Sequence, residues 1–159
     1  MNSKTFKRIS RIHGRLIGKY TKELIEGGIS VEQYLDFHER IDRSIMLFAR
    51  TFDDVNDYEA YLKTNCPDAY PVTAEETVDH EVEHYNIGVK HGLKRMTFGL
   101  FEFGNKGGHQ GVLIDHSSEN CRGWDKEKLL GYIKDTYEWV SNPSKEDIKS
   151  LKTLKSLGV

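Results

Sequence analysis

The sequence predicts an α+β fold: a single, mostly helical domain with a small antiparallel sheet. Two observations lead to this prediction. Apolar residues recur at helical spacing over several segments, among them 4–26, 30–50 and 73–91. Between residues 95 and 116 the period changes to alternation, which predicts a β-hairpin. A hairpin alone is only marginally stable in water, so we expect it to pack beside the helix of 73–91 or to find a further strand.

The size and composition of the chain fit one domain in a reducing compartment. Its 159 residues carry a formal net charge of −2, which leaves room for a core and gives no global argument for nucleic acid or a membrane surface. No apolar run is long enough to span a bilayer, and the first residues lack the apolar region of a secretory signal. Cys66 and Cys121 are too few for a disulfide scaffold. We therefore expect free thiols and a cytoplasmic location.

We expect residues 1–50 to form a helical hairpin, because only a glycine pair and a short joint separate its two amphipathic segments. Ser30 is the predicted cap of the second segment. Seven basic residues and no acid lie between Lys4 and Lys22. A basic amphipathic helix can bind nucleic acid or another acidic partner, and the alternative is a solvated face on a core helix. His38, in the second helix, is interpreted as a packing or surface residue.

The later segments complete the predicted architecture. The alternating pattern of the first hairpin strand changes phase beside Gly99, which predicts a β-bulge. Residues 105–108 form the expected turn. The segment 125–157 is predicted to hold two helices, which begin after caps at Asp125 and Ser144.

The segment 73–91 contains the pattern His-Glu-x-x-His, formed by His80, Glu81 and His84. Residues four apart share one face of a helix, so both imidazoles can reach one Zn²⁺ at roughly 2.1 Å. The glutamate between them then lies beside the metal, where it can take a proton from water. Thr73 supplies the expected cap of this helix. Its apolar stripe lies opposite the histidines and consists of Val78, Val82, Tyr85, Val89 and Leu93.

The motif resembles that of the zincin metallopeptidases, and the resemblance covers the motif helix alone. It implies a zinc-dependent hydrolase, a small metallopeptidase, in which His80 and His84 bind zinc and Glu81 is the general base. Two alternatives remain open on the sequence. One is a non-catalytic metal site that ties the helix to the hairpin, and the other is a solvated histidine face without a metal.

The sequence leaves the third metal ligand open. The metzincin branch of the zincins continues with a glycine and a third histidine, whereas Gly88 and His91 follow here with one extra residue before the glycine. On a straight helix His91 would lie about 16 Å along the axis from His80, so it could reach the metal only if the helix broke at Gly88. The candidates are His91 and His116, then His109 and Glu102, with Glu119 and Glu127 added by the resemblance to the gluzincin branch.

Overall fold

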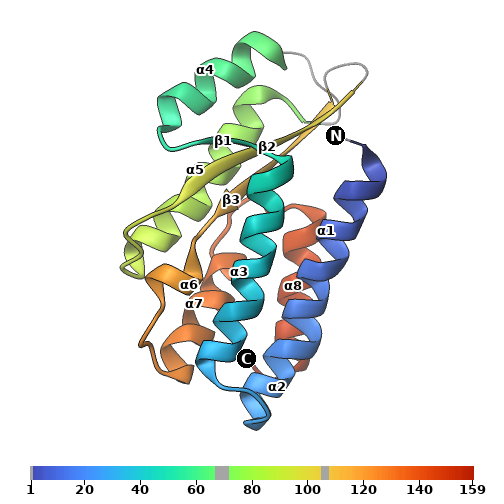
Figure 1. The fold of residues 1–159 in the computed structure, drawn as a ribbon. Helices are drawn as coiled ribbons and strands as arrows, with labels where there is room; N and C mark the ends of the chain where they lie inside the picture. The colour runs from blue at the N-terminus through green and yellow to red at the C-terminus, as the bar shows by residue number, and fades with distance from the viewer. Residues whose placement is uncertain (1, 67–71, 105–107) are drawn as a thin grey trace.

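The computed structural model describes residues 2–66, 72–104 and 108–159 (Figure 1). Its elements are α1 (Ser3–Arg15), the π-helical segment η1 (Leu16–Tyr20), α2 (Thr21–Glu26), α3 (Val31–Phe48), β1 (Arg50–Phe52), α4 (Val55–Asn65), α5 (Ala74–Lys90), β2 (Thr97–Phe103), β3 (Gly108–Ile114), α6 (Ser117–Asn120), α7 (Lys126–Glu138) and α8 (Lys145–Ser156). The predicted fold class, mostly helical with a small antiparallel sheet, is confirmed. Residues 105–107 of the expected turn lie outside the described residues. None of the described helices has the length and apolar character needed to cross a membrane.

The N-terminal helices follow the sequence pattern with one interruption. Instead of one continuous helix, α1 and α2 are joined by the π-helical turn of η1. Next to it the buried hydroxyl of Thr21 lies 3.2 Å from the hydroxyl of Tyr34 on α3. Gly27 ends α2 with a left-handed φ of 79°. At the start of α3 the predicted cap, Ser30, forms a capping box with Gln33.

Within the described residues the sheet has three strands, with β2 in the centre. β1 supplies the further strand, pairing Thr51 with Gly99. The register of β2 with β3 is continuous, so the predicted bulge beside Gly99 is wrong. The change of phase has another cause: Phe98 and Leu100 enter one apolar cluster, and Phe101 enters another. A central strand covered on both faces shows apolar residues in both phases.

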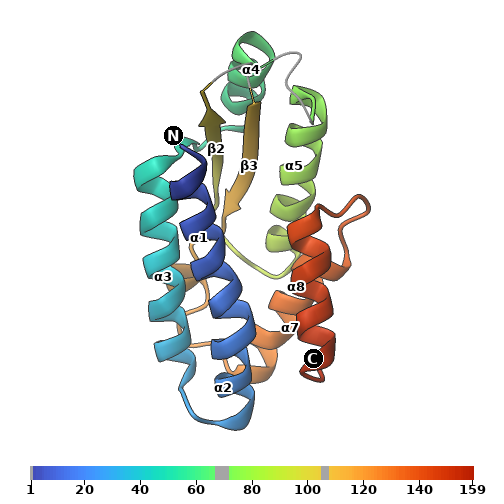
Figure 2. The same cartoon turned by 90° about the vertical axis from the view of Figure 1, so that its right-hand side faces the viewer.

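The two apolar clusters lie on opposite sides of the sheet. The larger is formed mainly by the bundle of α1, η1, α2, α3 and α7, and the smaller by α4, α5 and β2. Figures 1 and 2 show α5 on one side of the sheet and α1 and α3 on the other. α7 contacts α5, and α8 contacts both α7 and η1. The C-terminal helices therefore connect the bundle to the motif helix.

β3 passes close to α5 because residue 111 is a glycine. A Cβ atom on Gly111 would lie 2.6 Å from Cγ2 of Thr77, 2.9 Å from the hydroxyl of Tyr58 and 3.2 Å from Cγ of Glu81. Two of these separations are shorter than the 3.0 Å that real Cβ contacts keep. The glycine therefore sets how closely the sheet approaches the helix that carries the motif.

Gly111→Ala should lower the free energy of unfolding by about 1–3 kcal/mol, the typical effect of an extra methyl group in a packed interior. Urea unfolding followed by circular dichroism measures it. Gly131→Ala on α7 is the matched control, because a Cβ there meets no atom within 4 Å. It should raise stability by up to about 1 kcal/mol, since alanine favours a helix over glycine. Equal urea midpoints for Gly111→Ala and the wild type would contradict the close approach.

Candidate metal centre

The motif lies on α5, which begins as the sequence predicts. The hydroxyl of Thr73 accepts the backbone N–H of Glu76 at 3.2 Å. The predicted apolar stripe is wrong at Val89, which is 51% exposed. Thr77 and Glu81 are buried instead, against β3. The helix is thus covered on a second side, and its histidines do not form a solvated face.

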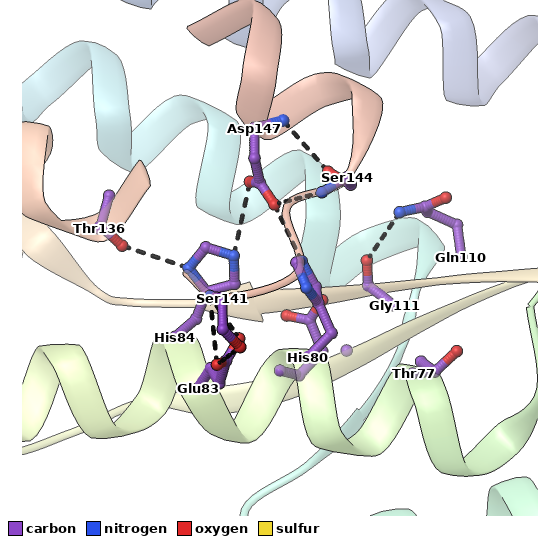
Figure 3. A network of polar contacts seen from close by, with 12 residues as sticks. Thr77, His80, Glu83, His84, Gln110, Gly111, Thr136, Ser141, Ser144 and Asp147 are labelled. Carbon is purple, nitrogen blue, oxygen red and sulfur yellow. Dashed lines mark hydrogen bonds and ion pairs between the residues drawn. The ribbon is translucent and has the colours of Figure 1, made fainter. Parts of the chain in front are cut away.

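His80 and His84 meet Asp147, in the first turn of α8 (Figure 3). Nε2 of His80 lies 3.0 Å from Oδ2 of Asp147, and Nε2 of His84 lies 3.5 Å from Oδ1. One donor atom from each of the three residues lies within 4.8 Å of the other two. Donors that share one zinc ion at about 2.1 Å are roughly 3–3.5 Å apart. Two imidazoles and a carboxylate at these distances fit a zinc site.

The N-terminal capping box of α8 positions Asp147. The hydroxyl of Ser144 accepts the N–H of Asp147 at 3.1 Å, and Oδ2 of Asp147 accepts the N–H of Ser144 at 3.0 Å. The loop before α8 is tied to α5 by Glu83, whose carboxylate accepts both the backbone N–H and the hydroxyl of Ser141 (Figure 3). The start of α8 is therefore held over the motif by local capping and by a contact with the motif helix itself.

Each motif histidine has a further partner that restrains its ring. Nδ1 of His84 lies 3.4 Å from the hydroxyl of Thr136 on α7. The backbone of Asn142, in the loop before α8, interacts with His80 and helps to raise its pKa. Partners of this kind orient metal-binding histidines and are needed for their affinity. Both rings are therefore directed at Asp147 by contacts outside the cluster.

Glu81 lies beside the cluster without being part of it. Its side chain is buried, and its Oε1 is 3.9 Å from Nε2 of His80. Burial raises the pKa of Glu81, and the charges of His84 and His80 oppose this shift. The hydrogen bond to Asp147 raises the pKa of His80 to about 9. Burial acts to raise the pKa of Asp147, but the hydrogen bonds from both histidines outweigh it and hold that pKa below its usual range.

The structure does not bring His91 or His116 together with the motif histidines. α5 is unbroken at Gly88, and Nε2 of His91, at its end, lies 3.0 Å from a carboxylate oxygen of Asp135. Among the described residues, the group that joins the pair is Asp147. The other candidates have partners of their own. His116 lies 2.7 Å from the hydroxyl of Thr97, and His109 lies 2.6 Å from that of Thr77. Glu102 pairs with Arg50 and Glu119 with Arg95, each at 2.9 Å, while Glu127 is exposed.

Comparison with known proteins does not assign the centre. No protein-family model, no curated protein and no solved structure matches the chain. The chemistry of the centre is therefore inferred from the motif and from the geometry around it.

His13 of α1 is half-buried and contacts α7. Its Nε2 is 3.2 Å from the hydroxyl of Tyr137 on α7. Burial, together with the charge of His38, lowers the pKa of His13 to about 4, against the opposing charges of Asp115 and Asp147. The imidazole is therefore neutral at pH 7.

Acid should destabilise the metal-free protein partly through His13. Its folded pKa of about 4 lies below the ordinary histidine pKa of 6.5, so the unfolded chain takes up this proton first. Stability is thus lost as the pH falls from 6.5 towards 4, by roughly 1–2 kcal/mol at pH 5. His13→Gln cannot titrate and should lack this part of the loss. Urea unfolding at pH 7 and pH 5, with a chelator present, measures the difference, and equal losses in both proteins would refute the assignment.

Proposed function

We propose that the protein is a zinc-dependent hydrolase, a small metallopeptidase, with its metal held by His80, His84 and Asp147. The observation that carries the proposal is the convergence of a carboxylate from α8 on both motif histidines, at 3.0 and 3.5 Å. Two histidines and one carboxylate form a ligand set of catalytic zinc sites. The peptide class of substrate rests on the resemblance of the motif to the zincins.

Zinc with three protein ligands keeps an open coordination position and supplies a Lewis acid that acidifies water. Glu81 is the residue that we assign as general base, because it borders the cluster and is not one of the three donors. Its carboxylate accepts a proton from the attacking water and passes it to the leaving amine. Packing against β3 at Gly111 restrains this side chain. The side chain of His80, 19% exposed, is the most open of the three, so we expect substrate to approach there.

We further propose a cytoplasmic location. Cys66 and Cys121 are free and buried, which suits a compartment that keeps thiols reduced. Burial raises the pKa of the Cys121 thiol to about 12, so this cysteine is unreactive at neutral pH. The thiols therefore serve packing and take no part in the proposed reaction.

Glu81→Gln should keep zinc near full occupancy and lower peptide hydrolysis by about 10²–10⁴-fold, because glutamine keeps the shape but cannot accept the proton. Zinc is measured by elemental analysis of untagged protein, and hydrolysis with a fluorogenic peptide library. If Glu81→Gln expels the zinc, Glu81 is a ligand and the mechanism is wrong. If the wild type binds no zinc, the proposal as a whole fails.

His84→Ala and Asp147→Asn should instead lose zinc and hydrolysis together, because each removes a metal ligand. His91→Ala is the matched control, since His91 lies on the same helix but pairs with Asp135. It should retain both. A purely structural metal site gives a different pattern: His84→Ala lowers the melting temperature, and Glu81→Gln changes nothing that is measured.

The basic N-terminal segment, which spans α1, η1 and α2, supports a second candidate function, nucleic-acid binding. All seven of its basic residues are exposed, and within residues 2–66, 72–104 and 108–159 none of them forms an ion pair. A shallow hollow in this segment is lined by Ser3, Lys4, Lys7 and Arg11. The cations are Lys4, Lys7, Arg8, Arg11, Arg15, Lys19 and Lys22. Uncompensated cations along one helical segment are suited to phosphates.

If the helix binds nucleic acid, a labelled DNA duplex should bind at low salt, with an affinity that falls steeply as salt rises. Exchanging Lys7 and Arg11 for glutamate should weaken binding by at least about tenfold, through lost phosphate contacts. Exchange of Lys152 and Lys155 on α8 alters the net charge equally and should have little effect. Fluorescence anisotropy measures the affinities. Absence of binding at 50 mM salt, a low-salt condition, would exclude this function.

A further inference from the structure

We propose that His38 and Asp42 of α3, together with Asp115, form a second metal-binding site. Nδ1 of His38 lies 3.7 Å from Oδ1 of Asp42 and 3.8 Å from Oδ1 of Asp115. One donor atom from each residue lies within 4.8 Å of the other two. These separations are too long for hydrogen bonds, whose usual limit is about 3.2 Å for N–H···O. They lie close to the roughly 3–3.5 Å between donors that share one ion.

Two polar atoms of this cluster are buried without a hydrogen-bond partner among the described residues: Nδ1 of His38 and Oδ2 of Asp42. Asp42 is only 6% exposed, so water does not compensate for the missing partner. The hydroxyl of Ser117, two residues after Asp115, is also buried and has no partner in the part of the chain that the structure describes. Buried polar atoms normally find partners, and each exception calls for an explanation. A shared cation satisfies the imidazole nitrogen and the carboxylate at once.

The third residue, Asp115, is held in place by a separate set of contacts. It follows β3 and precedes α6 in the chain. Its Oδ2 accepts the hydroxyl of Tyr132 at 2.8 Å, and its Oδ1 accepts the N–H of Ser117 at 3.1 Å. The side chain of Asn120 donates to its backbone carbonyl at 2.8 Å, which closes the turn. Outer contacts of this kind orient ligand carboxylates in metal sites.

The donor set indicates the class of ion. One imidazole nitrogen with two carboxylates suits a divalent first-row transition metal, whereas Mg²⁺ and Ca²⁺ prefer oxygen ligands alone. Zinc binds such donors more tightly than manganese or iron does, so zinc is the appropriate probe. The three side chains are 16%, 8% and 16% exposed, which leaves little access for a substrate. The site therefore has a structural role: it ties α3 to the turn after β3.

The competing account is an ion cluster without a metal, in which His38 is protonated between the two carboxylates. Burial acts to lower the pKa of His38, but the charge of Asp115 and the contact with Asp42 outweigh it and raise that pKa to about 9. Such a cluster would not take up zinc. Metal stoichiometry therefore separates the two accounts, and it does so without any assay of activity.

The experiment is a zinc titration of the untagged, chelator-treated full chain, with bound zinc counted by elemental analysis after desalting. We expect two equivalents in the wild type, one in His84→Ala, and none in His84→Ala combined with Asp42→Asn. Zinc should also raise the melting temperature of His84→Ala by several degrees, and lose this effect in the double variant. His91→Ala controls for the loss of a histidine outside both clusters and should keep two equivalents. If circular dichroism shows that the Asp42 variant is unfolded, Asp115→Asn replaces it.

The second site is overturned if His84→Ala takes up less than about a tenth of an equivalent, a level below that of a structural zinc site. It is also overturned if the zinc bound by His84→Ala survives both Asp42→Asn and Asp115→Asn. One equivalent in the wild type that persists in His84→Ala but is lost with Asp42→Asn supports the second site and refutes the first. The equivalents of zinc bound by the wild type and by His84→Ala still test the second site even if neither aspartate variant folds. The two proposals can therefore fail independently.

Discussion

The burial of one carboxylate, that of Asp147, is the constraint on which the rest of this structure depends. A buried carboxylate is stable only with charged or hydrogen-bonding partners around it. Asp147 has them in the two histidines of α5 and in the backbone of Ser144. The start of α8 must therefore lie over α5, and the loop before it must follow the contact between Glu83 and Ser141. Two helices that are distant in the sequence are thus joined by charged, hydrogen-bonding side chains.

The local part of this arrangement could be predicted from the sequence, and the long-range part could not. Thr73, Ser30 and Asp125 are caps in the structure as predicted, because capping depends on residues within one turn. The sequence does not identify Asp147 as a candidate metal ligand, because the pattern Ser144-x-x-Asp147 already has a complete local explanation as a capping box. A carboxylate in that position is rigidly held, and rigidity is what a metal ligand needs. The sequence contains no signal for which helix such a carboxylate will face.

The errors in predicting the sheet, the bulge beside Gly99 and the missed pairing with β1, also arise because a long-range contact leaves no local signal. The pattern beside Gly99 predicted a bulge because alternation in one phase was attributed to one buried face. β1, which contributes only three residues, makes β2 a central strand, and both phases then carry core residues such as Phe98 and Phe101. A strand as short as β1 has too few residues for a periodic pattern. The sequence therefore predicted the hairpin, whose strands are adjacent in the chain, and missed the pairing that crosses forty residues or more.

The two clusters found among the described residues share one construction: each takes two residues four apart on a helix and a third residue from elsewhere in the chain. His13 is close enough to both for the charges of His38, Asp115 and Asp147 to influence its pKa, and its low pKa keeps it neutral. A neutral imidazole adds no further charge to this region. Buried ion clusters are often no more stabilising than apolar residues of similar volume. Stability alone therefore gives little reason to build two of them into a domain of this size. The proposed binding of a cation would supply the reason that stability does not, since both clusters combine imidazole with carboxylate, the donors that divalent transition metals prefer.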